Sequence, residues 1–270
     1  MAQERGVPTA TYAIGVGPLQ RPRERQAVAE VLDAMAALTV RDTPTKRLLE
    51  EIGVEREIVV TADPALLLEP VDFPEEDLGR EGVHKGRPLV GMSIREPGAA
   101  ADDRARNNYH GLLAHAADFI VDRFDADVLF VPMERQDIRH AHRVIAKMAF
   151  VDRAAILRGD YTPGQVLGLM RHLDLAVGMR LHFLIFAALA QVPVLALPYA
   201  SKVRSFLEDL GIDPPSEVER HAGALLASID RLWDLREAQR DLLRARVPEL
   251  QERARRNALT VMPLLDDAAA

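Results

Sequence analysis

The segment 177–182 places an arginine and a histidine where a buried strand gives way to a helix. It reads Val-Gly-Met-Arg-Leu-His, with the strand predicted to end at Gly178 and the helix to begin at Leu181. The first turn of a helix carries unpaired amides and the positive end of the dipole, so it favours an anion. Arg180 adds a guanidinium that suits a carboxylate or phosphate, and His182 an imidazole that exchanges protons near neutral pH. The pattern indicates anion binding beside an acid–base group; a histidine that only caps or packs on the helix is the alternative.

Two further cations follow predicted strands in the second half of the chain. Arg95 stands at the end of one strand, and Lys202 stands in the first turn of a helix that follows another. Ligands of parallel α/β sheets bind at the carboxyl ends of the strands, so both are candidates for the same anion, with Ser93 and Tyr199 as further cleft residues. The alternatives are a surface ion pair between Arg95 and Glu96, and a solvated lysine.

A glycine turn, Gly-Val-Gly-Pro-Leu-Gln, follows the first predicted strand at 15–20. A dinucleotide-binding fingerprint needs a third glycine where Gln20 stands, and Pro18 removes an amide donor. We therefore expect no NAD or FAD here. Gly15 and Gly17 are predicted to form either a tight turn or a loop whose backbone lies close to a ligand.

Metal and cofactor chemistry finds little support in the sequence. The chain has no cysteine, which excludes disulfides, thiolate nucleophiles and cysteine-ligated metals. Asp137, His140 and His142 are close in sequence, but only Asp137 and His140 share a helix face, so a metal site is a weak hypothesis. We expect neither a metal nor a cofactor. The remaining histidines have no partner spacing and are interpreted as structural: His84, His110, His115, His172 and His221.

The composition is that of a globular protein. The 270 residues are 48% hydrophobic, and 34 basic against 41 acidic residues give a net charge of −7, which makes a nucleic-acid partner a poor expectation. The length suits one large domain or two small ones. The most apolar stretch, 183–199, is interrupted by Gln191 and Pro193, so we interpret it as a buried helix and strand rather than a membrane span. The first six residues lack the apolar core of a secretory signal.

Alternation of short apolar runs with amphipathic ones predicts an α/β fold. The first half has predicted strands at 9–16, 39–42 and 58–62 and helices at 24–38 and 43–52, the second helix with Thr43 as N-cap. The second half has five strand–helix units, which must form a parallel sheet with right-handed crossovers. Its predicted strands are 89–94, 127–132, 154–157, 175–178 and 194–197, and its helices are 105–124, 137–148, 162–172, 181–191 and 201–210.

The predicted domains follow this division. Residues 1–69 form a partial Rossmann-like domain, 70–88 an interdomain linker rich in proline, glycine and charge, 89–221 a complete Rossmann-like domain, and 222–270 C-terminal helices. A break is predicted near Pro248. The arginine-rich face of this tail is interpreted as solvated, or as a helix that crosses back to a neighbouring domain or lies on a membrane surface.

Several blocks of the sequence are similar to the polysaccharide pyruvyl transferase family. They are YAIGVGPL at 12–19, TVRDTPTKRLLEEIGV at 39–54, VTADPALLL at 60–68, VGMSIRE at 90–96, LFVPMERQD at 129–137 and, above all, the long block 174–211. The resemblance implies a GT-B-like fold of two Rossmann-like domains facing a cleft. It also implies transfer of the enolpyruvyl group of phosphoenolpyruvate onto two sugar hydroxyls as a cyclic ketal.

The resemblance also assigns roles to residues. The family's arginine after the first strand of the second domain matches Arg95, and its Arg-Leu-His motif matches Arg180, Leu181 and His182; these bind the donor, with the histidine close to the chemistry. Lys202 matches the lysine of a Tyr-x-x-Lys motif that begins at Tyr199.

The family usually has about a hundred further residues before this region, including a Gly-Asn-x-Gly-Asp loop and a Gly-Gly-Gly segment. We therefore expect much of the acceptor site to lie outside this sequence, so a second copy of the chain or another partner could complete the fold. The expected acceptor is a sugar or lipid-linked saccharide, which implies a cytoplasmic protein, peripheral at the inner membrane face. Two alternatives stay open: a GT-B glycosyltransferase or epimerase that uses a nucleotide sugar, and a non-catalytic donor-binding module.

Overall fold

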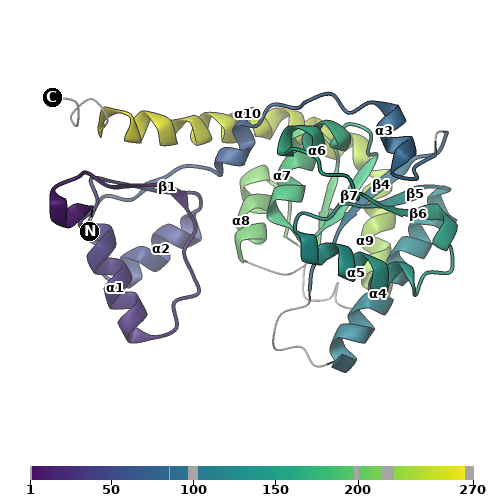
Figure 1. Cartoon of the computed structure of the whole chain (residues 1–270), viewed down its shortest axis with the longest axis horizontal. Helices are drawn as coiled ribbons and strands as arrows, with labels where there is room; N and C mark the ends of the chain where they lie inside the picture. Colours follow the sequence, from purple (N-terminus) through teal and green to yellow (C-terminus); the bar gives the residue numbers. More distant parts are fainter. Residues whose placement is uncertain (1, 85, 97–102, 198–200, 215–221, 265–270) are drawn as a thin grey trace. The chain divides into compact units, whose positions relative to one another are not determined.

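The computed structural model describes residues 2–84, 86–96, 103–197, 201–214 and 222–264, apart from the side chains of residues 4, 103–108 and 201. The chain folds into two compact units (Figure 1). Unit 1 consists of Met1–Leu67 and Arg246–Ala270, and unit 2 consists of Leu68–Ala245.

Unit 2 is built on a five-stranded parallel sheet, as the alternating pattern predicted. The spatial order is β6-β5-β4-β7-β8, and every neighbouring pair is parallel. The chain therefore builds the sheet outward from β4 in one direction and then reverses to add β7 and β8 on its other side. The strands are β4 (Leu89–Ser93), β5 (Asp127–Phe130), β6 (Ala154–Ile156), β7 (Leu175–Gly178) and β8 (Val194–Ala196).

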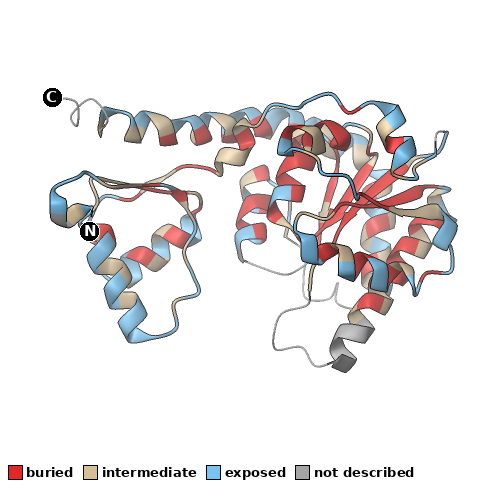
Figure 2. Cartoon of the chain, viewed as in Figure 1, coloured by how far each residue is buried: buried red, intermediate tan, exposed pale blue. Residues whose placement is uncertain are grey.

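Helices cover both faces of this sheet, so its strands read as continuous apolar runs rather than alternating ones. One face packs on α4 (Asp103–Phe124), α5 (Arg135–Ile145) and α9 (Ala222–Asp234), and the other on α6 (Pro163–Met170), α7 (Leu181–Leu189) and α8 (Ser201–Leu210). In Figure 2 the central strands are red along their length.

Unit 1 has a smaller parallel sheet, β1-β2-β3, formed by β1 (Ala10–Ile14), β2 (Ala37–Val40) and β3 (Val59–Val60). The connecting helices are α1 (Pro22–Asp33) and α2 (Thr43–Glu51), and the unit also contains the short 3-10 helices η1 (Gln3–Arg5) and η2 (Pro64–Leu67). The N-cap of α2 is Asp42 rather than the predicted Thr43, because Asp42 Oδ1 accepts from the amide of Thr45 at 2.8 Å.

The connection over 70–88 is a structured strap of unit 2. It contains the short helix α3 (Glu75–Arg80), and Phe73 is buried at 2% exposure. The Phe73 carbonyl lies 2.7 Å from His172 Nε2, and Glu81 accepts hydrogen bonds from the amide of Arg158 and the hydroxyl of Tyr161. This strap shows no periodic pattern of apolar residues in the sequence, because individual side chains such as Phe73 and Glu81 hold it to the rest of unit 2.

The C-terminal helices divide between the units. The helix break predicted near Pro248 lies instead at Leu235, between α9 and α10 (Arg236–Val261). Proline removes only one amide donor, and the residues on both sides of it, Val247 and Leu250, are buried. Within unit 1, buried Asn257 accepts from Thr61 Oγ1 at 2.7 Å, so the end of α10 is bonded to the segment that follows β3.

Candidate anion-binding site at the strand ends

Strands β4 and β7 bring the two predicted arginines to one edge of the sheet. Ser93 pairs with Gly178 in the parallel register, and Arg95 and Arg180 each follow two residues later. The strand order reverses between these strands, which is where open α/β sheets bind ligands. The register therefore places Arg95 and Arg180 at the same edge of the sheet.

A close contact fixes the start of α7 beside this edge. A Cβ atom on Gly178 would lie 2.5 Å from Cδ1 of Phe183, a fully buried ring in the first turn of α7. The helix begins at Leu181, whose side chain is buried, whereas the side chain of His182 is exposed. A ligand at the helix start would thus meet the imidazole of His182 but only the backbone of Leu181.

Arg180 is held by two carboxylates that follow β5. Its Nε and Nη2 donate to Asp137 at 3.0 and 2.6 Å, and its Nη1 donates to Glu134 at 2.5 Å. Asp137 is 1% exposed and also accepts the amides of Met133 and Glu134, whereas the side chain of Glu134 is 50% exposed. Three of the five guanidinium N–H groups thus have carboxylate partners within the described part of the chain.

Both arginines act on Glu134. Burial raises the pKa of the Glu134 carboxyl, but the hydrogen bond from Gln136 and the positive charges of Arg180 and Arg95 outweigh it, so the pKa lies below its usual range. The half-buried Arg95 contributes less to this lowering of the pKa than Arg180 does.

A buried histidine pair lies behind these residues. Nε2 of His110 and Nδ1 of His140 are 3.1 Å apart, and the two rings stack at 15°. Burial lowers the pKa of His140 more than the carboxylates of Glu96 and Asp137 raise it. One N–H···N bond between the two rings satisfies both of these nitrogens, so the pair packs as a hydrogen-bonded unit in the core.

The other predicted site residues have different positions. Ser93 is completely buried, which puts its hydroxyl inside the sheet rather than on a cleft surface. Lys202 is exposed in the first turn of α8, after the neighbouring strand β8. Tyr199 lies outside the described residues. Gly15 and Gly17 belong to unit 1, where they lie in the loop after β1, and Gly17 has a φ of 119°.

Glu134 is not among the predicted site residues, and Asp137 and His140 were predicted only as a weak metal pair. The available signal was their position: Glu134 and Asp137 follow β5, and β5 lies next to β4 in this sheet. No group of three potential metal ligands forms among the described side chains. The helices that the structure describes include none with the length and apolar character needed to cross a membrane.

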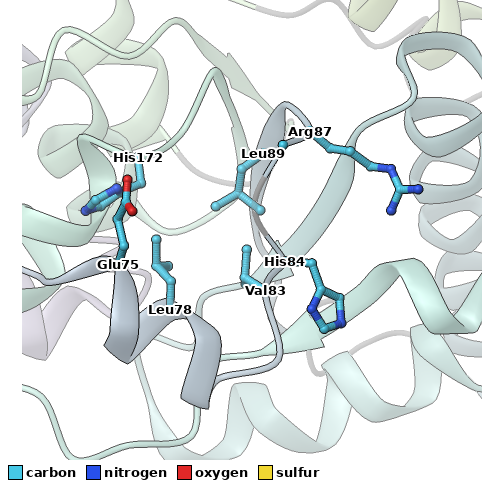
Figure 3. Close-up of a pocket in the computed structure, with 8 residues that line it drawn as sticks. Glu75, Leu78, Val83, His84, Arg87, Leu89 and His172 are labelled. Carbon is cyan, nitrogen blue, oxygen red and sulfur yellow. The ribbon is translucent and has the colours of Figure 1, made fainter.

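A cavity of about 390 Å³ lies elsewhere in unit 2 (Figure 3). It is at the amino end of β4, the opposite end of the strand from Arg95, and is therefore separate from the site described above. Its lining is Glu75, Leu78, Val83, His84, Gly86, Arg87, Leu89 and His172.

The fold places the protein among the GT-B-like α/β proteins. It is similar to S. aureus MnaA, solved with UDP (13% identity, TM-score 0.65, covering 97% of this chain and 71% of that one), and to an α,α-trehalose-phosphate synthase from Burkholderia vietnamiensis (14%, 0.58, 98% and 71%). It is also similar to a UDP-GlcNAc 2-epimerase from Methanocaldococcus jannaschii, solved with UDP-GlcNAc and UDP (13%, 0.55, 86% and 64%). The chain thus spans 64–71% of the length of these proteins.

The sequence identifies the family within this fold. The model of the polysaccharide pyruvyl transferase family matches residues 1–201, so the chain belongs to that family, as the sequence blocks indicated. No protein of curated function matches the sequence. The matched region contains β4, β7 and the residues Arg95, Arg180 and His182.

Proposed function

We propose that this chain binds phosphoenolpyruvate at the carboxyl ends of β4 and β7 and transfers its enolpyruvyl group to a saccharide. The observation that carries the proposal is that Arg95 and Arg180 each follow the paired ends of β4 and β7 by two residues, with the exposed His182 at the start of α7, in a chain of the pyruvyl transferase family. The donor carries a carboxylate and a phosphate, and planar guanidinium groups bind both well.

The helix start and the two arginines together would hold the donor. The first amides of α7 point toward the ligand edge, and they favour a phosphate there. Lys202, at the start of α8, would add a charge at the neighbouring strand end. Because Arg180 is anchored on buried Asp137, its guanidinium plane is oriented before the donor arrives, which lowers the entropic cost of binding.

His182 is the proposed acid–base group. One sugar hydroxyl attacks the central carbon of the donor and loses its proton, while the methylene carbon gains a proton and becomes a methyl group. The second hydroxyl then replaces the phosphate at the same carbon, which closes the cyclic ketal and releases inorganic phosphate. The exposed imidazole would transfer one of these protons, and the arginines would stabilise the charge that develops on the phosphate.

The proposal includes the acceptor and the location. The acceptor is a sugar or lipid-linked saccharide of a cell-wall or exopolysaccharide precursor, presented in the cytoplasm or at the inner membrane face. We propose no cofactor and no nucleic-acid partner; a second copy of the chain remains a candidate partner.

Binding and product formation test the proposal. Isothermal titration should detect phosphoenolpyruvate binding, and mass spectrometry should detect a pyruvate ketal after incubation with donor and a panel of saccharide precursors. His182→Ala should lower ketal formation by about 10²- to 10⁴-fold and leave the fold intact, because this side chain is exposed. His142→Ala, which removes an exposed histidine on α5, is the matched control. Unchanged turnover in His182→Ala would exclude the imidazole from the mechanism.

A nucleotide-sugar enzyme is the second candidate, favoured by the fold similarity to proteins solved with UDP. A thermal-shift titration separates the two. Stabilisation by phosphoenolpyruvate supports the pyruvyl transferase, and stabilisation by UDP-sugars alone supports the second candidate.

A further inference from the structure

The carboxylate of Glu134 occupies a ligand-like position on Arg180. It accepts from Nη1 at 2.5 Å, on the side of the guanidinium that the bidentate bond to Asp137 leaves open. The positive charge of Arg95 also contributes to lowering its pKa. A carboxylate bonded to one arginine and attracted by another has the surroundings that the carboxylate or phosphate of a donor would require.

The two carboxylates on Arg180 differ in how firmly they are held. Asp137 is buried, bonds the guanidinium twice and accepts two backbone amides at the start of α5, so its removal from Arg180 would leave a buried charge unpaired. Glu134 has one bond to Arg180, and half of its side chain is exposed to solvent. Glu134 is therefore the partner that a ligand can replace.

We propose that Glu134 holds the ligand position on Arg180 in the unliganded protein, and that an anionic donor displaces it, with uptake of a fraction of a proton at acidic pH. This inference rests on the proposed function, because it concerns the same donor site. The Glu134 carboxylate then competes with the ligand for Arg180. Only the fraction of molecules in which Glu134 has left Arg180 can bind an anion, so the apparent affinity is lowered in proportion to that fraction.

The charges that face Glu134 explain why the displaced carboxylate takes up a proton more readily. In the unliganded site, Arg95 and Arg180 balance Asp137 and Glu134. When an anion takes the guanidinium, Glu134 loses its partner and gains a negative neighbour. Both changes raise its pKa from the lowered value of the unliganded state. Solvent can supply the proton because the side chain is half exposed.

Titration calorimetry of the whole chain tests this inference. The ligands are phosphoenolpyruvate and inorganic sulfate, which stays a dianion at both test conditions, pH 5 and pH 8. The proteins are the wild type, Glu134→Gln and, as the control, Glu76→Gln, which removes an exposed carboxylate on α3. Glu134→Ala serves as a second variant, and thermal unfolding confirms that each variant is folded.

Glu134→Gln should bind both ligands about three- to tenfold more tightly than the wild type at pH 8, as expected for a half-exposed ion pair. The advantage should shrink at pH 5, because the wild-type carboxyl then takes up its proton more readily. At pH 5 the wild type should take up a fraction of a proton on binding sulfate, as measured in two buffers of different ionisation enthalpy, and Glu134→Gln should not. Glu76→Gln should behave as the wild type.

Three results would overturn the inference in different ways. If phosphoenolpyruvate binds the wild type and Glu134→Gln equally at both pH values, the proposed function stands and the displacement of Glu134 is wrong. If Glu134→Gln binds more weakly, Glu134 contacts the ligand rather than competing with it. If neither ligand binds any of the proteins, both proposals fail.

Discussion

The two units differ in how they hold an arginine at the end of a strand. Each has an arginine shortly after a strand of its parallel sheet, and each arginine pairs with two carboxylates. In unit 1, Arg41 lies 3.5 Å from Asp42 and 3.2 Å from Asp63, and these carboxylates are only 10% and 12% exposed. In unit 2, the corresponding residue is Arg180, and one of its partners is half exposed.

The two arginines also differ in what covers the side of the guanidinium that faces away from the carboxylates. The backbone of Gly15 packs against Arg41, since a Cβ atom there would lie 2.5 Å from its Nη2. Arg41 is thus enclosed by buried Asp42, by partly buried Asp63 and by backbone, and it acts as a clamp that ties together the ends of β1, β2 and β3. An arginine at a strand end is a candidate for ligand binding only where at least one of its partners can be replaced.

The largest difference in stability and donor binding should appear when one carboxylate partner of each arginine is neutralised. Asp137→Asn should lower the free energy of unfolding by about 3 kcal/mol and weaken phosphoenolpyruvate binding, because Arg180 loses its bidentate partner. Asp63→Asn should cost about 1 kcal/mol, because Arg41 keeps Asp42, and should leave donor binding unchanged. Denaturant unfolding and calorimetry measure both effects. Equal loss of donor binding in the two variants would refute the division into clamp and site.

A matched pair of glycine substitutions should give a smaller effect. Gly178→Ala forces a methyl group against the buried ring of Phe183, which should cost about 1–3 kcal/mol and shift the start of α7, so that donor affinity falls. Gly15→Ala presses on the guanidinium of Arg41 and should destabilise the protein without changing donor affinity. Thermal unfolding with and without phosphoenolpyruvate distinguishes them. Full ligand stabilisation of Gly178→Ala would show that the position of α7 does not control the site.

Lys202→Ala should have the smallest effect. The side chain is exposed in the first turn of α8, and a solvent-screened charge contributes little to affinity. We expect donor binding to weaken about two- to fivefold at low salt and less at high salt. Calorimetry at two ionic strengths checks this expectation, and a loss comparable to that of Asp137→Asn would instead place Lys202 in direct contact with the donor.

Much of the fold could be predicted because local patterns specify it. Apolar runs and amphipathic stretches located the strands and helices of both sheets, and strand–helix alternation predicted parallel pairing. One exception has a local cause, and the other two depend on tertiary contacts. Asp42 replaced Thr43 as the cap of α2, buried neighbours carried α10 through Pro248, and the strap over 70–88 is fixed by Phe73 and Glu81.

The sequence by itself determined that an arginine and a histidine stand at the start of a helix after a buried strand, because strand ends and helix starts depend on residues close together in the chain. Only the tertiary structure decided what Arg180 touches. Asp137 and Glu134 lie more than forty residues earlier, and they reach Arg180 because the strand order sets β5, β4 and β7 side by side. Whether each partner is permanent or replaceable then depends on burial, which the packing of the whole unit sets.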